Sequence, residues 1–224
     1  MKKTKALSLL LSLLLLLSSL TLPLLAVDAE TAADPEQTQT DSADAPAEDD
    51  SVPEDRLLSS RTSFSVAAKA ALLIDLNTGR AVYEQDADER VYPASLTKIM
   101  TCLLALENGN LSDVVTVSAS ALDDLDADSS VAGLQVGEQM TLENLLYCMM
   151  VVSGNDACNV IAEHIAGSVA DFVRMMNQRA YELGCLNTHF SNPHGLHDES
   201  HYTTARDLSI ITQAALKSEN FRQI

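Results

Sequence analysis

Ser95 and Lys98 are the first pair of residues whose types and spacing could do chemistry. A helix that begins at Ser95 would place both side chains on one face, one turn apart. A lysine in apolar surroundings loses its proton readily, and the neutral amine can accept the proton of a serine hydroxyl. Free N–H groups at the start of the helix would stabilise negative charge on a reacting oxygen. The pair therefore predicts a serine nucleophile with a lysine base, against the alternative of an N-capping serine and a solvated lysine.

A second group, Ser153-Gly154-Asn155, interrupts two apolar stretches where a continuous helix would have been easy. A serine hydroxyl at this place could relay a proton to a leaving amine, and an asparagine amide could bind a peptide carbonyl or hold a lysine. On this triplet alone, the favoured interpretation is an ordinary turn between helices, with Asn155 or Asp156 as the N-cap.

Three histidines, His194, His197 and His201, have a spacing that could indicate zinc. They lie in a segment that follows Pro193 and reads as a loop, so a helix would not bring them to one face. We therefore expect no metal at this place.

The four cysteines would permit disulfides in an oxidising compartment, but their spacing fits no compact disulfide framework. Three of them lie in apolar sequence with helical character, so we expect buried free thiols that pack as small hydrophobic side chains. They are Cys102, Cys148, Cys158 and Cys185.

The elements that must position these residues are two early strands followed by helices. Apolar runs around a turn at 77–79 predict a β-hairpin from 69–75 and 80–84, and 114–117 is a short β-like piece. Apolar residues at helical spacing predict the helices 96–106, 141–152, 157–165, 169–183 and 204–217. This is a low strand content for a complete α/β domain.

The N-terminal part of the chain predicts export. Residues 1–5 are basic, 6–27 are almost wholly apolar, and small residues precede a cleavage point after Ala29. This layout is typical of a secretory signal peptide over 1–29, and the alternative is an uncleaved membrane anchor. Either interpretation predicts an extracytoplasmic protein, secreted or associated with the cell envelope.

Residues 30–60 read as an acidic, disordered linker, and 61–224 as the catalytic domain. Eleven carboxylates and no lysine or arginine lie between residues 28 and 55, which favours a solvated segment. The formal net charge of −18 argues against nucleic acid as a partner.

Taken together, the motifs resemble those of serine-type D-alanyl-D-alanine carboxypeptidases, the low-molecular-mass penicillin-binding proteins. The resemblance extends in register from Lys69 to the C-terminus. Its motifs include Pro93-Ala94-Ser95-Leu96-Thr97-Lys98, Ser153-Gly154-Asn155-Asp156-Ala157, Asn192-Pro193-His194-Gly195-Leu196 and Tyr202-Thr203-Thr204-Ala205-Arg206-Asp207-Leu208. It implies an α/β fold of the penicillin-binding-protein and β-lactamase type.

The resemblance also implies roles. Ser95 would be the acylated nucleophile, with its N–H as half of the oxyanion hole, and Lys98 its base. Ser153 would pass a proton to the leaving D-alanine, and Asn155 would hold the substrate backbone and Lys98. The implied partners are peptidoglycan stem peptides that end in D-Ala-D-Ala and β-lactam antibiotics that acylate the serine. No cofactor or metal is implied, and a longer parent protein would associate with the membrane.

The third motif of the family, Lys-Thr-Gly on a later strand, is absent from the sequence. We therefore expect an incomplete fold: a hairpin and a helical region, without the later strands of the sheet. An incomplete sheet would leave the apolar faces of the first strand (71–74) and of the catalytic helix partly uncovered. We expect these 224 residues alone to be poorly soluble and not acylated by penicillin.

Two other functions compete with this one. A class A-like β-lactamase shares the first two motifs but needs a carboxylate that activates the deacylating water, and Glu182 lies within a continuous predicted helix. The second alternative is a truncated module that binds peptidoglycan or penicillin without catalysis. Rapid turnover of a chromogenic cephalosporin would indicate the β-lactamase. The reading frame beyond residue 224 tests the non-catalytic module, since an in-frame Lys-Thr-Gly would indicate an enzyme.

Overall fold

The computed structural model describes residues 65–123, 125 and 129–224. All of these belong to one compact unit, Leu58–Ile224. The predicted signal peptide at 1–29 and the predicted linker at 30–60 lie outside the described residues. No helix within the described ranges is both long enough and apolar enough to cross a membrane.

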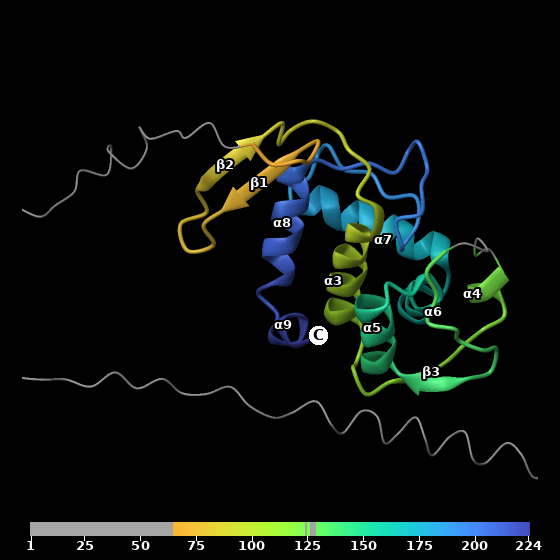
Figure 1. Ribbon diagram of the computed structural model, residues 1–224. Coiled ribbons are helices and arrows are strands. Elements are labelled where there is room, and N and C mark those ends of the chain that lie inside the picture. The colour runs from red at the N-terminus through yellow and green to blue at the C-terminus, as the bar shows by residue number, and fades with distance from the viewer. Residues whose placement is uncertain (1–64, 124, 126–128) are drawn as a thin grey trace, which may run out of the picture. The chain divides into compact units, whose positions relative to one another are not determined.

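The predicted hairpin is confirmed. Strands β1 (Ala71–Ile74) and β2 (Ala81–Gln85) pair antiparallel, and Gly79 adopts a φ of 70° in the turn between them. A positive φ is readily adopted by glycine, which has no Cβ. The hairpin lies beside helix α8 (Ala205–Ala215), at the edge of the helical region (Figure 1).

The predicted helix after Pro93 is present, but its start differs from the expectation. Residues Ala94–Thr97 form a 3-10 turn, η1, and the α-helix α3 runs from Lys98 to Asn108. Gly109 follows as the C-cap, at the predicted stop. Ser95 therefore lies in the tighter turn that leads into α3.

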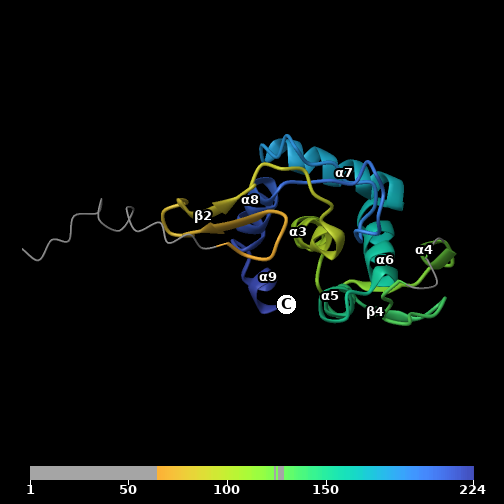
Figure 2. The same ribbon diagram turned by 45° about the horizontal axis from the view of Figure 1, so that its top comes forward.

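Helix α3 is the centre of the helical region. It packs against α5 (Leu142–Val151), α6 (Asn155–Ala166), α7 (Val169–Glu182) and α8, and in Figure 2 it is seen end-on between them. The short α9 (Glu219–Gln223) also contacts it. Neighbouring helices bury most side chains of α3, but Ile99 on this helix is only partly buried. The catalytic helix is therefore partly uncovered, as expected.

The core consists of two hydrophobic clusters, and α3 supplies residues to both. One lies between α3, α5, α6 and the segment around β3, and its fully buried members include Cys102, Leu142, Leu145, Leu146, Met149 and Ile161. The other lies between α3, α7 and α8, and its fully buried members include Met100, Phe172, Met176, Phe190 and Ile211.

Three short elements were not predicted: the strand β4 (Gln139–Thr141), the helix α4 (Ser120–Asp123) and α9. Strand β4 pairs antiparallel with β3 (Val114–Thr116), which the sequence did indicate. Each of these three elements is five residues or shorter, so none displays a full hydrophobic period.

The apolar side of the hairpin is partly open, as expected. Leu73 on β1 is 57% exposed, and Leu96 in η1 is 53% exposed. A groove of about 450 Å³ runs between β1, η1 and α8. Its apolar lining includes Ala71, Leu72, Ile74, Leu96, Ile99 and Leu208.

Candidate active site

The backbone around Ser95 presents its hydroxyl to solvent while the next turn is buried. Ala94 adopts a φ of 49°, a left-handed conformation that is rare for a residue with a Cβ. Ser95 is exposed, whereas Lys98 is only 3% exposed. The Lys98 Nζ lies 3.4 Å from the Ser95 Oγ. The two side chains therefore share one turn, as the sequence predicted.

Lys98 is held by two further oxygen atoms. Its Nζ donates to the Asn155 Oδ1 at 2.8 Å and to the His194 carbonyl oxygen at 2.8 Å. Burial lowers the pKa of Lys98, and this effect outweighs a smaller opposing influence of the Cys158 thiol. In the neutral amine, the two N–H groups can serve these acceptors, and the lone pair is left for the Ser95 hydroxyl.

The Ser153-Gly154-Asn155 corner lies between α5 and α6 and meets the same serine. Ser153 has a φ of 58°, and its Oγ lies 3.0 Å from the Ser95 Oγ. Asn155 begins α6 and is 4% exposed. The structure thus brings together all four residues that the sequence predicted, with both Lys98 and Ser153 near the Ser95 hydroxyl.

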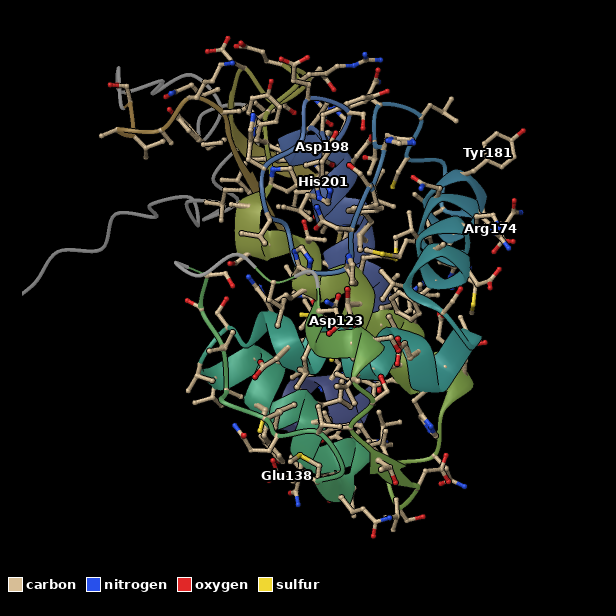
Figure 3. The ribbon with its side chains drawn as sticks, turned by 90° about the vertical axis from the view of Figure 1, so that its right-hand side faces the viewer. Asp123, Glu138, Arg174, Tyr181, Asp198 and His201 are labelled. Atoms are coloured by element: carbon tan, nitrogen blue, oxygen red, sulfur yellow. The ribbon has the colours of Figure 1, made fainter. Side chains whose placement is uncertain are left out.

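The segment 191–203 fixes the start of α3 from the other side. The His201 Nε2 lies 2.8 Å from the Thr97 Oγ1, and the Thr101 Oγ1 donates to the Pro193 carbonyl oxygen at 2.6 Å. Figure 3 labels Asp198 and His201 in this loop, and the His201 N–H donates to the Asp198 carbonyl oxygen at 2.9 Å.

The contacts of this segment with η1 and α3 were not predicted from the sequence. The Pro193-His194-Gly195 motif carried part of the family resemblance, but the contacts of the segment with Thr97, Lys98 and Thr101 join residues 92 to 104 positions apart in the chain. No local spacing could have identified these pairs.

The three histidines do not form one site. His194 and His201 are buried, and burial lowers the pKa of each to about 4. The Nδ1 of His201 accepts from the Ser191 N–H at 3.1 Å, so in the neutral ring the proton is on Nε2 and points to Thr97. His197 is exposed, with its ring edge-to-face against Tyr92. Within residues 65–123, 125 and 129–224, no cluster of three His, Cys, Asp or Glu could hold a metal.

The four cysteines are free thiols. Cys102, Cys158 and Cys185 are buried, and burial raises the pKa of each to about 12. Cys148 is partly buried. Thiols with such raised pKa values stay protonated and pack as small apolar groups, as expected.

Comparison with known proteins assigns the chain to a family. The family of D-alanyl-D-alanine carboxypeptidases matches residues 57–224. The chain therefore belongs to this family of serine peptidases.

Individual relatives agree with this assignment. The carboxypeptidase DacF of Bacillus subtilis is 43% identical over 162 residues, which are 68% of this chain and 40% of the relative. The carboxypeptidase DacA of Haemophilus influenzae is 41% identical over 155 residues, 67% of this chain and 39% of the relative. The chain thus spans about 40% of the length of these curated relatives.

Solved structures confirm the fold class. A variant of the DD-transpeptidase of Streptomyces K15 superposes with a TM-score of 0.68 at 36% identity, covering 71% of this chain and 65% of that one. Penicillin-binding protein 5 of Haemophilus influenzae gives a TM-score of 0.65 at 39% identity, covering 69% of this chain and 46% of that one. The described residues therefore have part of the α/β fold of penicillin-binding proteins.

Proposed function

We propose that this protein acts as a serine-type D-Ala-D-Ala carboxypeptidase that removes the terminal D-alanine from peptidoglycan stem peptides. The observation that carries the proposal is the position of the Ser95 hydroxyl, with Lys98 at 3.4 Å and Ser153 at 3.0 Å. The names of the relatives supply the substrate class.

The first step would form an acyl-enzyme. Lys98, as a neutral amine, takes the proton of the Ser95 hydroxyl, and the Oγ attacks the carbonyl carbon between the two terminal D-alanines. The carbon–nitrogen bond then breaks, and the leaving amine receives a proton through the Ser153 hydroxyl. The Asn155 amide nitrogen would donate to the substrate backbone, because its oxygen is occupied by Lys98.

The second step would hydrolyse the acyl-enzyme and regenerate the free enzyme. Water attacks the ester carbonyl, its proton passes to Lys98, and the Ser95 oxygen leaves and is reprotonated. The N–H of Ser95 would stabilise the oxyanion in both steps. A β-lactam would acylate the same Ser95 hydroxyl by opening its ring. Because the proposed substrate is peptidoglycan, the enzyme would act outside the cytoplasm, in the cell envelope.

According to the family resemblance, a Lys-Thr-Gly motif would supply the second oxyanion donor and hold the substrate carboxylate. Neither the non-catalytic binding module nor the β-lactamase alternative is favoured, since the relatives that match are named carboxypeptidases.

The test compares two forms of the protein, the 224-residue chain and the product with any residues that its gene encodes after Ile224. Each is incubated with a peptide that ends in D-Ala-D-Ala, and free D-alanine is measured. We expect release by the natural gene product and none by its Ser95→Ala variant. Binding of the peptide without D-alanine release would favour the non-catalytic module, and equal release by Ser95→Ala would remove Ser95 from the mechanism.

A further inference from the structure

A buried carboxylate lies directly after the Ser153-Gly154-Asn155 corner. Asp156 is 2% exposed, and its two oxygens accept four backbone N–H groups. The Oδ1 accepts from Ala132 at 2.8 Å and from Ala157 at 2.9 Å. The Oδ2 accepts from Gly133 at 2.8 Å and from Leu134 at 3.0 Å. One side chain on α6 thus binds three consecutive N–H groups of a segment more than twenty residues away.

The bound segment, residues 130–134, lies against the corner. The Ser130 carbonyl oxygen accepts from the Asn155 N–H at 2.8 Å. A Cβ built on Gly154 would lie 3.2 Å from the Ala132 Cβ and 2.9 Å from the Asp156 Oδ1. The corner therefore has the 130–134 segment on one side, at contact distance, and has little freedom to move away from it.

The corner in turn controls the position of the reactive groups. Ser153 holds a φ of 58°, which is unfavourable for serine and persists only where the surrounding structure enforces it. Its hydroxyl reaches Ser95, and the Asn155 Oδ1 reaches Lys98. A shift of the 130–134 segment would therefore change both the Ser153–Ser95 contact and the Asn155–Lys98 contact.

We propose that Asp156 is a positioning residue for the active site, because it holds residues 130–134 on the corner and so keeps Ser153 against Ser95 and Asn155 against Lys98. The effect on rate rests on the proposed function, whereas the effect on Lys98 does not. The competing explanation is that Asp156 only stabilises α6, as a carboxylate in its first turn.

A pair of variants separates these explanations. In Asp156→Asn, the amide offers only one acceptor oxygen, so one of the two pairs of N–H groups loses its partner, and at least one N–H group of the 130–134 segment is released in either orientation of the amide. The matched control is Asp207→Asn: Asp207 is also a buried aspartate in the first turn of a helix, and it accepts from the Asn187 N–H at 2.8 Å. Both variants should be less stable than the wild type.

The decisive readout is the pKa of Lys98, followed by NMR of the labelled lysine side chain. Burial is the main reason that the Lys98 pKa lies below 10.5, so opening the corner to water should raise it. We expect a rise in Asp156→Asn and none in Asp207→Asn. If the Lys98 pKa is no higher in Asp156→Asn than in the control, the positioning role is wrong.

A second pair of variants covers the case in which Asp156→Asn does not fold. Gly133 and Gly137 have φ values of 83° and 85°, and a Cβ at either would meet nothing within 4 Å. Alanine at each place adds backbone strain without a clash, but only Gly133 belongs to the bound segment.

Gly133→Ala should speed amide exchange of Ala132 and Leu134 roughly fivefold or more and raise the Lys98 pKa. Gly137→Ala should leave both as in the wild type. Identical behaviour of the two variants at Lys98 would overturn the proposal. Failure of the proposed function would appear differently, as a wild-type protein that releases no D-alanine while Lys98 still responds to Gly133→Ala.

Discussion

Gly195 lies so close to the backbone of Ala94 that a Cβ on it would be 1.8 Å from the Ala94 carbonyl oxygen. Ala94 immediately precedes Ser95, and both Ala94 and Gly195 have positive φ values, 49° and 91°. The loop that supplies the His194 carbonyl to Lys98 therefore also braces the backbone from which the nucleophile projects.

Gly195→Ala should destabilise the protein by about 3–5 kcal/mol for two reasons: the Ala94 carbonyl must move, and the new alanine must adopt a strained positive φ. The matched control is Gly184→Ala, which has a φ of 84° and no atom within 4 Å of an added Cβ. It should lose only about 1–3 kcal/mol from strain. Urea unfolding measures both values, and equal losses would show that the approach to Ala94 is not tight in solution.

Ser153→Ala should slow acylation of the natural gene product by roughly 10²–10⁴-fold, the usual contribution of a positioned proton-transfer group. The Ser153 hydroxyl is 3.0 Å from the Ser95 Oγ. Stopped-flow acylation by a chromogenic or fluorescent β-lactam gives the rate. Ser209→Ala removes a hydroxyl that donates to the Arg206 carbonyl oxygen of its own helix at 2.7 Å, and this variant should react as the wild type does. An undiminished rate in Ser153→Ala would exclude the proton relay.

Lys98→Arg should abolish acylation even though it keeps a positive charge beside Ser95, because a guanidinium does not give up its proton in the accessible pH range. In the wild type, acylation should rise with pH through the pKa of Lys98, since only the neutral amine accepts a proton. Burial places that pKa below 10.5. A pH–rate profile tests both statements, and acylation by Lys98→Arg at a comparable rate would contradict the role of the amine.

Because two histidines are buried in the folded protein, we expect the free energy of unfolding to fall in acid. His194 and His201 titrate near pH 4 in the folded protein, below the ordinary value of 6.5, because burial disfavours the charged ring. The unfolded chain therefore binds more protons between pH 6.5 and 4, and folding stability falls as the pH drops through this window. The contribution of each histidine is at most roughly 3 kcal/mol.

His201→Gln should flatten the pH dependence of the free energy of unfolding, although it also lowers stability at neutral pH. Urea titrations at pH 7, 5.5 and 4.5 provide the comparison. An equal slope in His201→Gln and the wild type would mean that His201 is not held neutral by the fold.

The longer elements could be predicted from the sequence because each shows its own periodicity. The N-caps of helices α5, α7 and α8 are Thr141, Ser168 and Thr204, whose side chains accept N–H groups of the first turn. An N-capping residue followed by apolar residues at helical spacing is a local signal. Strand β4 and helices α4 and α9 are too short to give such a signal.

The candidate catalytic residues could also be predicted from the sequence. The backbone conformations and distant contacts that position them could not. Ser95 and Lys98 carry a local spacing, and Ser153 and Asn155 a local break between apolar runs. The positive φ values of Ala94 and Ser153 had no sequence signal, because the strain is enforced by distant contacts. The bonds of Asp156 to Ala132 and of Thr97 to His201 join residues 24 and 104 positions apart, which no spacing reveals.

The proposed function requires that the Ser95 hydroxyl becomes covalently acylated. The natural gene product, with any residues encoded after Ile224, is incubated with penicillin and digested, and the modified peptide is located by mass spectrometry. We predict an adduct on Ser95 that is absent from the Ser95→Ala variant. An adduct on another residue, or a protein that stays unmodified while its fold is intact, would contradict the account.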